Sequence, residues 1–236
     1  MSVVRVLVEG WEPSVGELVL PPGEVHHLKV RRVSLGDEVV VLNGQGWEAR
    51  GVLVARDRVE IGEVKEVLDR EPPFRLTLYL GFLKGEKMDL VVQKATELGA
   101  EAVVPLVTRR CVPRPRPSRV ERWRAIAREA LKQCGGTLLP RIEPPMELEE
   151  VSLEGEGWVL WEGEENNPLP QGAGEGKGAL AVGPEGGWEK GEVRLLISRG
   201  FRTATLGPRI LRAETAAIVG MGLLLRTGRG KGKGRG

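Results

Sequence analysis

The first 70 residues alternate short β-rich runs with turns, which is the pattern of a small all-β domain. The runs cover residues 3–8, 17–21, 37–44, 47–54 and 58–68. Between two of them stands N-G-Q-G at residues 43–46, a strong hairpin signal because both glycines accept a positive φ. This pattern predicts a β-barrel over residues 1–70.

The pattern changes after the segment D-R-E-P-P at residues 69–73, because consecutive prolines can neither extend a helix nor join a central strand. Beyond it, short apolar runs alternate with amphipathic stretches. The predicted strands are 74–82, 100–107, 158–161, 179–182 and 201–206, and the predicted helices are 85–98, 118–134, 189–200 and 216–225. This alternation predicts a second, α/β domain over residues 73–228 with a parallel sheet.

Two of these helices carry clear signals. The first places apolar residues on one face before Gly99 ends it: Met88, Val91, Val92, Ala95 and Leu98. The second is expected to open with a capping box of Ser118 and Glu121 and to end at Gly135. Its predicted buried face consists of Val120, Trp123, Ala127, Ala130 and Cys134.

Composition excludes several classes of protein. The chain has 236 residues, of which 41% are hydrophobic and 29% charged, as in an ordinary globular protein. It shows neither a signal peptide nor an apolar run of about 20 residues, so a cytoplasmic location without membrane contact is expected. With two cysteines and two adjacent histidines, neither a disulfide framework nor a metal site is expected.

The net charge of +2 is unevenly distributed. Residues 226–236 carry five positive charges and no negative one, which leaves −3 for the remainder. This glycine-rich tail is expected to be disordered over 229–236, either as a contact for a polyanion or as a solubilising segment. A second basic cluster occupies residues 109–124. Two separated basic patches favour nucleic acid over a small acidic substrate.

Basic side chains also gather at residues 26–37, where H-H-L-K-V-R-R indicates a short helical stretch. From it we expect phosphate contacts by His26, Lys29, Arg31 and Arg32. A solvated helix face is the alternative interpretation, and it is the commoner case for a run of charges.

Two motifs follow predicted strands of the second domain, where open α/β sheets bind ligands. The first, G-P-E-G-G at residues 183–187, lets the backbone approach a ligand closely, although a tight strand-to-helix turn would also explain it. The second, L-G-P-R-I-L-R-A-E-T-A at residues 206–216, places Arg209, Arg212 and Glu214 just before an apolar helix. Buried charges must be paired or serve a site, so an Arg212–Glu214 or Arg209–Glu185 ion pair is a structural explanation.

Together with K-G-E-K-M-D-L-V-V-Q-K-A-T-E-L-G at residues 84–99, these motifs resemble those of the bacterial small-subunit ribosomal RNA uridine N3-methyltransferases of the SPOUT class. The resemblance covers nearly the whole chain. It implies a PUA-like barrel joined to an α/β domain with a deep trefoil knot, and a homodimer with the knotted regions packed together. The implied substrate is ribosomal RNA within the small subunit.

The resemblance also implies S-adenosylmethionine as cofactor, held mainly by backbone groups of three loops. These correspond here to Leu160 and Gly163; Gly183, Pro184, Glu185, Gly186 and Gly187; and Leu206, Gly207, Ile210 and Leu211. Three departures from the family pattern stand out: Glu189 in place of a serine cap, Arg109 in place of an acid, and Gly135-Gly136 in place of a Gly-Arg pair.

The implied reaction transfers a methyl group to uracil N3, which requires an unpaired or flipped base and loss of the N3 proton. Arg212 is expected to stabilise the resulting anion or to orient the uracil. Glu214 and Glu185 are expected to position the arginines or to accept a proton, so Arg212, Glu214 and Arg209 are the candidate catalytic residues. We expect further RNA contacts at Lys84, Lys87, Arg109 and Arg110.

Two other functions stay open from the sequence. One is a knotted methyltransferase that acts on a ribose 2′-OH or on transfer RNA. The other is a non-catalytic RNA-binding module, for which the barrel and the basic segments would suffice.

Overall fold

The computed structural model describes residues 3–111 and 117–226 and divides the chain into two compact units. The first unit consists of Met1–Glu71 and Arg128–Leu139, and the second of Pro72–Ala127 and Pro140–Gly236. The sequence did not indicate that a segment from the middle of the chain groups with the first unit. The tail predicted to be disordered, residues 229–236, lies outside the described residues.

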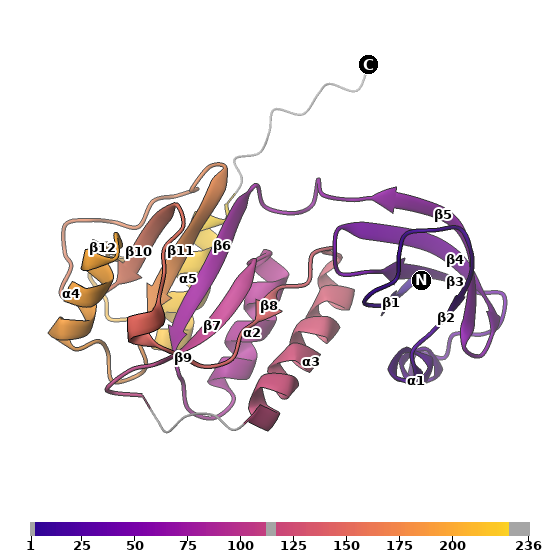
Figure 1. Cartoon of the computed structure of the whole chain (residues 1–236), viewed down its shortest axis with the longest axis horizontal. Helices are drawn as coiled ribbons and strands as arrows, with labels where there is room; N and C mark the ends of the chain where they lie inside the picture. The colour runs from indigo at the N-terminus through magenta and orange to yellow at the C-terminus, as the bar shows by residue number, and fades with distance from the viewer. Residues whose placement is uncertain (1–2, 112–116, 227–236) are drawn as a thin grey trace, which may run out of the picture. The chain divides into compact units, whose positions relative to one another are not determined.

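The first unit is built on one five-stranded sheet (Figure 1). Its strands are β1 (Val4–Leu7), β2 (Gly16–Val19), β3 (Glu38–Leu42), β4 (Trp47–Ala55) and β5 (Arg58–Glu66), with helix α1 (Pro22–Val30) between β2 and β3. The spatial order is β1-β3-β4-β5-β2, in which only the β1–β3 pair is parallel. All five predicted strands are present, and buried side chains from each of them and from α1 form one core.

The predicted hairpin at residues 43–46 joins β3 to β4. The side chain of Asn43 accepts the N–H groups of Gln45 at 2.8 Å and Trp47 at 3.1 Å, and Gly44 and Gly46 have positive φ. The helix predicted within 26–37 instead starts earlier and stops at Val30, because Arg32 adopts a left-handed conformation with φ 57°.

The second unit is a parallel sheet covered on both faces, as the alternation of strands and helices predicted. Its strands are β6 (Phe74–Gly81), β7 (Ala102–Val107), β8 (Arg141–Ile142), β9 (Met146–Glu147), β10 (Glu156–Leu160), β11 (Gly176–Val182) and β12 (Arg202–Ala204). The order is β12-β10-β11-β6-β7-β8, and β9 also pairs with β7. Strands β8 and β9 have two residues each and were not predicted from the sequence.

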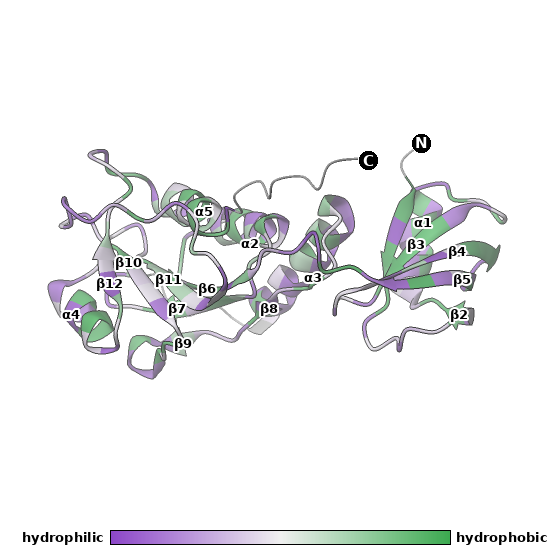
Figure 2. Cartoon of the chain, turned by 90° about the horizontal axis from the view of Figure 1, so that it is seen from above, coloured by the Kyte–Doolittle hydropathy of each residue, from purple (hydrophilic) through white to green (hydrophobic). Residues whose placement is uncertain are grey.

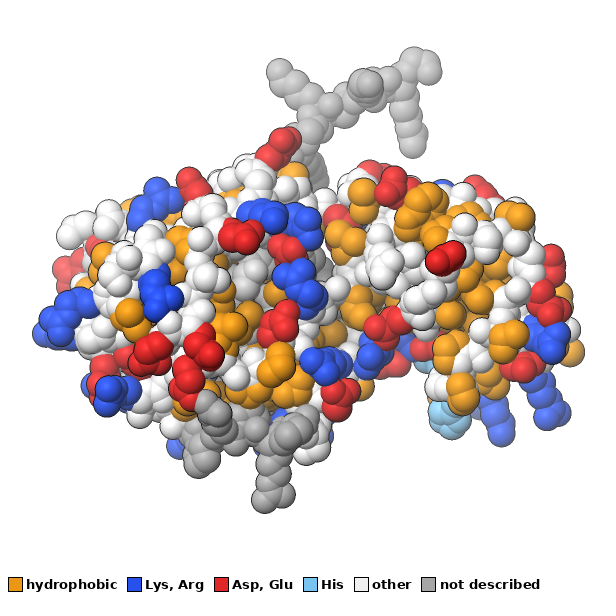
Figure 3. All heavy atoms as spheres, viewed as in Figure 1, with side chains coloured by type: hydrophobic (Ala, Val, Ile, Leu, Met, Phe, Trp, Pro, Cys, Tyr) orange, Lys and Arg blue, Asp and Glu red, His pale blue; other side chains and the backbone are white. Residues whose placement is uncertain are grey.

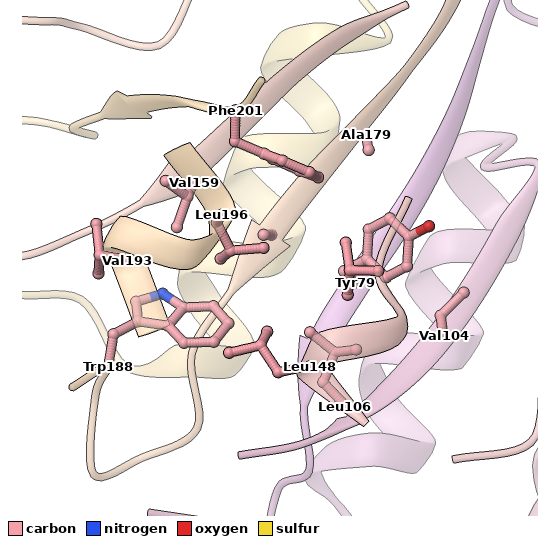
Figure 4. Close-up of a cluster of buried hydrophobic side chains, with 12 residues drawn as sticks. Tyr79, Val104, Leu106, Leu148, Val159, Ala179, Trp188, Val193, Leu196 and Phe201 are labelled. Carbon is pink, nitrogen blue, oxygen red and sulfur yellow. The ribbon is translucent and has the colours of Figure 1, made fainter. Parts of the chain in front are cut away.

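The helices are α2 (Lys87–Leu98), α3 (Pro117–Cys134), α4 (Lys190–Ser198) and α5 (Ala213–Leu224), with a short 3-10 turn η1 (Leu148–Glu150). Helices α2 and α5 pack on one face of the sheet, and α4 lies on the other (Figures 1 and 2). On the α4 face, Tyr79, Val159, Trp188, Leu196 and Phe201 belong to a single buried cluster (Figure 4). Alternate β6 residues such as Leu78 and Leu80, fully buried, fill the opposite face.

Helix α2 begins two residues later than predicted, and most of its predicted face is confirmed: Met88, Val91, Val92 and Ala95 are fully buried, whereas Leu98 is half-buried. Gly99 caps the helix in a left-handed conformation, as predicted. Helix α3 corrects two predictions. It begins at Pro117, a residue favoured at the first helical position, so Ser118 lies inside the helix and does not cap it. Cys134 is exposed, whereas Leu131 and Lys132 are buried.

Helix α5 begins at Ala213, three residues before the predicted start. Glu214 therefore lies in its first turn and Arg212 at the residue before it. The two arginines expected to be buried, Arg209 and Arg212, are exposed, and only Glu214 is buried. The charges of this segment are thus divided between the surface and the interior.

Candidate functional site

Four parallel strands of the second unit end at one edge of the sheet: β6 at Gly81, β10 at Leu160, β11 at Val182 and β12 at Ala204. The loops that follow them include all three predicted cofactor loops. The edge outside the carboxyl ends of such strands is where open α/β sheets bind ligands.

The G-P-E-G-G loop fits tightly against its neighbours. A Cβ on Gly81 would lie 2.5 Å from both Cδ and N of Pro184, and one on Gly183 would lie 3.2 Å from the indole of Trp188. Trp188 Nε1 donates a hydrogen bond to the Leu160 carbonyl at 3.0 Å. This buried tryptophan, whose role the sequence did not indicate, joins the first two predicted cofactor loops.

The third loop, residues 206–212, offers the backbone groups that a ligand requires. Gly207 has φ 110°, and a Cβ there would meet no atom within 4 Å, so the space beside it is open. The N–H groups of Leu206, Ile210 and Leu211 form no hydrogen bond within the described part of the chain. Ile210 is 89% exposed. Free donors beside open space fit a ligand held by main-chain contacts.

Glu164 fixes the loop that follows Leu160. Its carboxylate accepts the hydroxyl of Thr203, the N–H groups of Asn166 and Asn167, and the Asn167 side-chain amide. The Thr203 hydrogen bond, followed by that from Asn166 N–H, lowers the pKa of Glu164 to about 2. A parallel bridge between Pro168 and Thr205 holds the same loop beside the end of β12.

Three charged side chains meet at the same edge. Lys87 Nζ lies 3.0 Å from Glu185 Oε1 and 3.6 Å from Glu214 Oε2, and the Lys84 N–H also donates to Glu185 at 3.0 Å. Burial raises the pKa of Glu185, but the hydrogen bonds from Lys84 N–H and Lys87 outweigh it, and the net pKa lies below its ordinary value. The hydrogen bond with Glu185 raises the pKa of Lys87.

The ion pairs suggested by the sequence, Arg212–Glu214 and Arg209–Glu185, are therefore not formed. Lys87 pairs with both Glu185 and Glu214, because α2 begins beside the G-P-E-G-G loop and α5 packs along α2. Arg209 and Arg212 form no ion pair within the described residues and project to the surface. Both guanidinium groups are thus available to an anionic ligand.

The basic residues after β7 are tied to the start of α4. Arg109 N–H donates to buried Glu192 at 2.9 Å, and the Arg110 guanidinium donates to the Gly186 carbonyl at 3.0 Å. Glu192 also accepts the N–H of Glu189 at 2.8 Å, and the Glu189 carboxylate accepts the N–H of Glu192 in return, so a capping box forms where the family has serine. On the face shown in Figure 3, basic and acidic side chains are interspersed over the second unit.

In the first unit, His26 and Lys29 within α1 and Arg31 and Arg32 just after it are all exposed, and Figure 3 shows histidine and basic side chains together on this unit. His27 is half-buried beside Lys132, and burial, followed by the Lys132 charge, lowers the pKa of His27. Lys132 itself, 2% exposed, pairs with Glu24 at 2.9 Å and Glu129 at 2.8 Å.

Within residues 3–111 and 117–226, no group of three or more His, Cys, Asp or Glu side chains is placed to hold a metal ion. Among the helices of that same part of the chain, none is both long and apolar enough to cross a bilayer.

Comparisons with known proteins agree with this geometry. Residues 70–225 match the family described as an RNA methyltransferase domain, and residues 20–63 match that of an RNA methyltransferase PUA domain. The Ribosomal RNA small subunit methyltransferase E of Synechocystis sp. is 33% identical over 86% of this chain and 71% of its own length. The protein of that name from Aquifex aeolicus is 30% identical, with 88% and 93% covered.

The crystal structure of a Ribosomal RNA small subunit methyltransferase E from Neisseria gonorrhoeae bound to S-adenosyl methionine superimposes with a TM-score of 0.83. The two sequences are 29% identical, and 93% of this chain and 95% of the other are covered. On the family match and on relatives at 30% identity or more over most of their length, the chain belongs to the RNA methyltransferase family that includes ribosomal RNA small subunit methyltransferase E.

Proposed function

We propose that this chain uses S-adenosylmethionine to methylate N3 of a uridine in small-subunit ribosomal RNA. The observation that carries the proposal is the edge at which the glycine loop 183–187, the loop 206–212 and the Lys87–Glu185–Glu214 group meet. The family membership and the S-adenosyl methionine bound to the Neisseria gonorrhoeae structure support the same cofactor and class of substrate.

The residues fit the cofactor by the chemistry of their backbone groups. The free N–H groups of Leu206, Ile210 and Leu211 can bind the polar edges of an adenine and an amino acid moiety, beside the open space at Gly207. The Leu160 carbonyl is already taken by Trp188, so any contact at that position uses another backbone group. When bound, S-adenosylmethionine supplies an electrophilic methyl group on a sulfonium.

The chain's own residues must hold the uracil and favour the loss of its N3 proton. Arg212 is exposed, precedes α5 and is free of ion pairs within the described chain, so its guanidinium can face the anionic base. Glu185 accepts two hydrogen bonds and its lowered pKa makes it a weak base. We therefore assign Arg212 to contact with the uracil, with exposed Arg209 beside it. Glu185 and Glu214 are assigned to positioning the arginines.

The RNA is expected to contact exposed His26, Lys29, Arg31 and Arg32 of the first unit. Arg109 and Arg110 are held against α4 and the G-P-E-G-G loop, so contact with RNA there would act directly on a cofactor loop. We also expect the trefoil knot. Its support is that Gly172 and Ala173, which precede β11, donate hydrogen bonds to Leu223 and Leu224 at the end of α5.

The first test is calorimetric titration of the whole protein with S-adenosylmethionine, followed by nucleoside analysis of RNA after turnover. Binding together with N3-methyluridine supports the proposal. A ribose 2′-O-methylated product, or activity on transfer RNA alone, would move the chain to the other knotted-methyltransferase function. No cofactor affinity with or without RNA, while RNA binding persists, would indicate a non-catalytic RNA-binding module.

Arg212→Ala tests the role of this arginine. We expect turnover to fall about 100-fold, the size of the loss of a group that stabilises developing charge, with cofactor affinity unchanged. The matched control is Arg194→Ala, which removes an exposed arginine from α4. Loss of turnover and cofactor affinity in parallel would contradict a role at the base.

A further inference from the structure

Lys87 connects three segments that are far apart in the sequence. It is the first residue of α2, it forms a hydrogen bond with Glu185 of the G-P-E-G-G loop, and it lies 3.6 Å from Glu214 in the first turn of α5. One ammonium group thus stands between a predicted cofactor loop and the segment that carries Arg209 and Arg212.

The position of this lysine opposes the local preference of the helix. The N-terminus of a helix carries partial positive charge, which favours acidic side chains and disfavours a lysine. Its two carboxylate partners compensate for that placement, and the raised pKa of Lys87 follows from them. The two carboxylates, and not the start of the helix, therefore explain why a lysine stands at this position.

Glu214 depends on Lys87 in turn. The residue is 9% exposed, its Oε2 atom has no hydrogen-bond donor, and Lys87 is its ion-pair partner among the described residues. A buried carboxylate without a counter-charge is strongly destabilising. Glu185 has a second donor in Lys84 N–H, so the loss of Lys87 would affect Glu214 more than Glu185.

We propose that Lys87 is a positioning residue that holds the G-P-E-G-G loop and the start of α5 in one arrangement, so that the cofactor loop and the arginine-bearing segment are set together. This inference rests on the proposed function of the same edge. It replaces the expectation that Lys87 binds an RNA phosphate, because its ammonium is held by two carboxylates.

The test compares Lys87→Met with Lys84→Met in the whole protein. Both variants remove one positive charge near the same loop, but Lys84 holds Glu185 through its backbone N–H, which methionine retains. We expect Lys87→Met to bind S-adenosylmethionine about tenfold more weakly, the effect of losing a hydrogen bond to a charged group, and Lys84→Met to bind it as the unaltered chain does.

RNA binding separates a positioning role from a phosphate contact. For Lys87→Met we expect unchanged RNA affinity and unchanged salt dependence, and for Lys87→Arg a partial recovery of cofactor affinity. If Lys87→Met retains full cofactor affinity while its RNA affinity falls and the salt slope drops by about one, Lys87 is a phosphate contact and the proposal is wrong.

A double-mutant cycle with Glu214→Gln tests the link without any ligand. Because a neutral amide needs no counter-charge, Lys87→Met should lower the thermal midpoint less in the Glu214→Gln background than in the unaltered chain. Additive shifts would overturn the proposal even if all variants fold. This stability measurement tests the role of Lys87 separately from the proposed function. The proposed function is wrong if the unaltered chain neither binds the cofactor nor methylates RNA.

Discussion

Arg32 is the residue of the first unit whose backbone conformation calls for an explanation. Its φ of 57° falls in the left-handed region, which costs a non-glycine residue roughly 1–2 kcal/mol. Arg32 follows the end of α1. Its N–H donates to the Lys29 carbonyl, and the N–H of Val33 donates to the Leu28 carbonyl. A helix that ends in this way usually has glycine in the left-handed position. A strained arginine at this position is consistent with a side chain retained for contact with RNA.

We predict that Arg32→Gly leaves the thermal stability unchanged or raised while RNA affinity falls. Glycine makes the unfolded chain more flexible, which costs about 1 kcal/mol of stability, and the relief of the left-handed strain offsets this cost. The control Arg31→Gly removes the same charge from a right-handed residue and should lower the stability by about 0.5–1 kcal/mol. Thermal unfolding and RNA titration check this, and undiminished RNA affinity in Arg32→Gly would remove the residue from the RNA surface.

At the residue scale, the sequence located the site better than it located its contacts. The glycine loop and the segment 206–216 do lie at one edge, because each follows a strand of the parallel sheet and the carboxyl ends of parallel strands meet at the same edge. The partner of each carboxylate was not predictable, since Lys87 meets Glu185 and Glu214 only after α2 and α5 have packed together. Trp188 was not predicted to have a role, yet its buried indole donates a hydrogen bond to the Leu160 carbonyl.

At the element scale, the loop after β10 depends on a single carboxylate. The Glu164 carboxylate accepts hydrogen bonds from Asn166, Asn167 and Thr203, and its pKa of about 2 lies well below the ordinary value of 4.5. A depressed pKa means that the folded state holds the ionised form more strongly than the unfolded chain does. The resulting stability is complete above pH 4.5 and is lost as the pH falls toward 2.

We predict that Glu164→Gln is less stable than the unaltered chain at neutral pH, and that the difference narrows below pH 4.5 and closes near pH 2. Thermal midpoints of both proteins across this range measure it. Glu165→Gln, an exposed change in the same loop, should follow the unaltered chain at every pH. A difference that stays constant with pH would show that the carboxylate's charge is not what fixes the loop.

The helices show where local patterns suffice and where they fail. Helix α2 was predictable because its apolar spacing and Gly99 act within the element. In α3 the same spacing placed Cys134 inside, but the end of the helix groups with the first unit and buries Lys132 instead, which pairs with Glu24 and Glu129. The start of α5 was missed because polar Glu214 and Thr215 precede the apolar run that begins at Ala216, although Glu214 is buried beside Lys87.

For the chain as a whole, the alternation of strands and helices was enough to predict a parallel sheet and the strand edge at which the candidate site lies. The strand order was not, because β12 pairs with β10 while α5 returns to pack on β11, β6 and α2. Such a crossing runs against the usual rule that successive elements lie side by side. A trefoil knot, which chain topology rules alone would reject, stays an expectation that comes from the family resemblance.

Helix α5 gives the last prediction, which concerns assembly. Its sequence is almost wholly apolar, yet Val219 is 40% exposed, and Ala216, Gly222 and Leu223 on the same helical face are only half-buried. Leu90 of α2, against which α5 packs, is also 40% exposed. Exposed apolar side chains on two helices that pack together are typical of an interaction site, and a second copy of this chain is the partner that the family resemblance implies.

We predict that the protein is a homodimer and that Val219→Glu makes it monomeric, because the interface would have to bury an unpaired carboxylate. Ile197→Glu is the matched control, since Ile197 is 47% exposed on α4, across the sheet from α5. Sedimentation velocity should show a dimer for the control and a monomer for Val219→Glu at the same concentration, with far-ultraviolet circular dichroism unchanged in both. A dimer that survives Val219→Glu would place the interface elsewhere, and the exposed face of α5 would then need another partner.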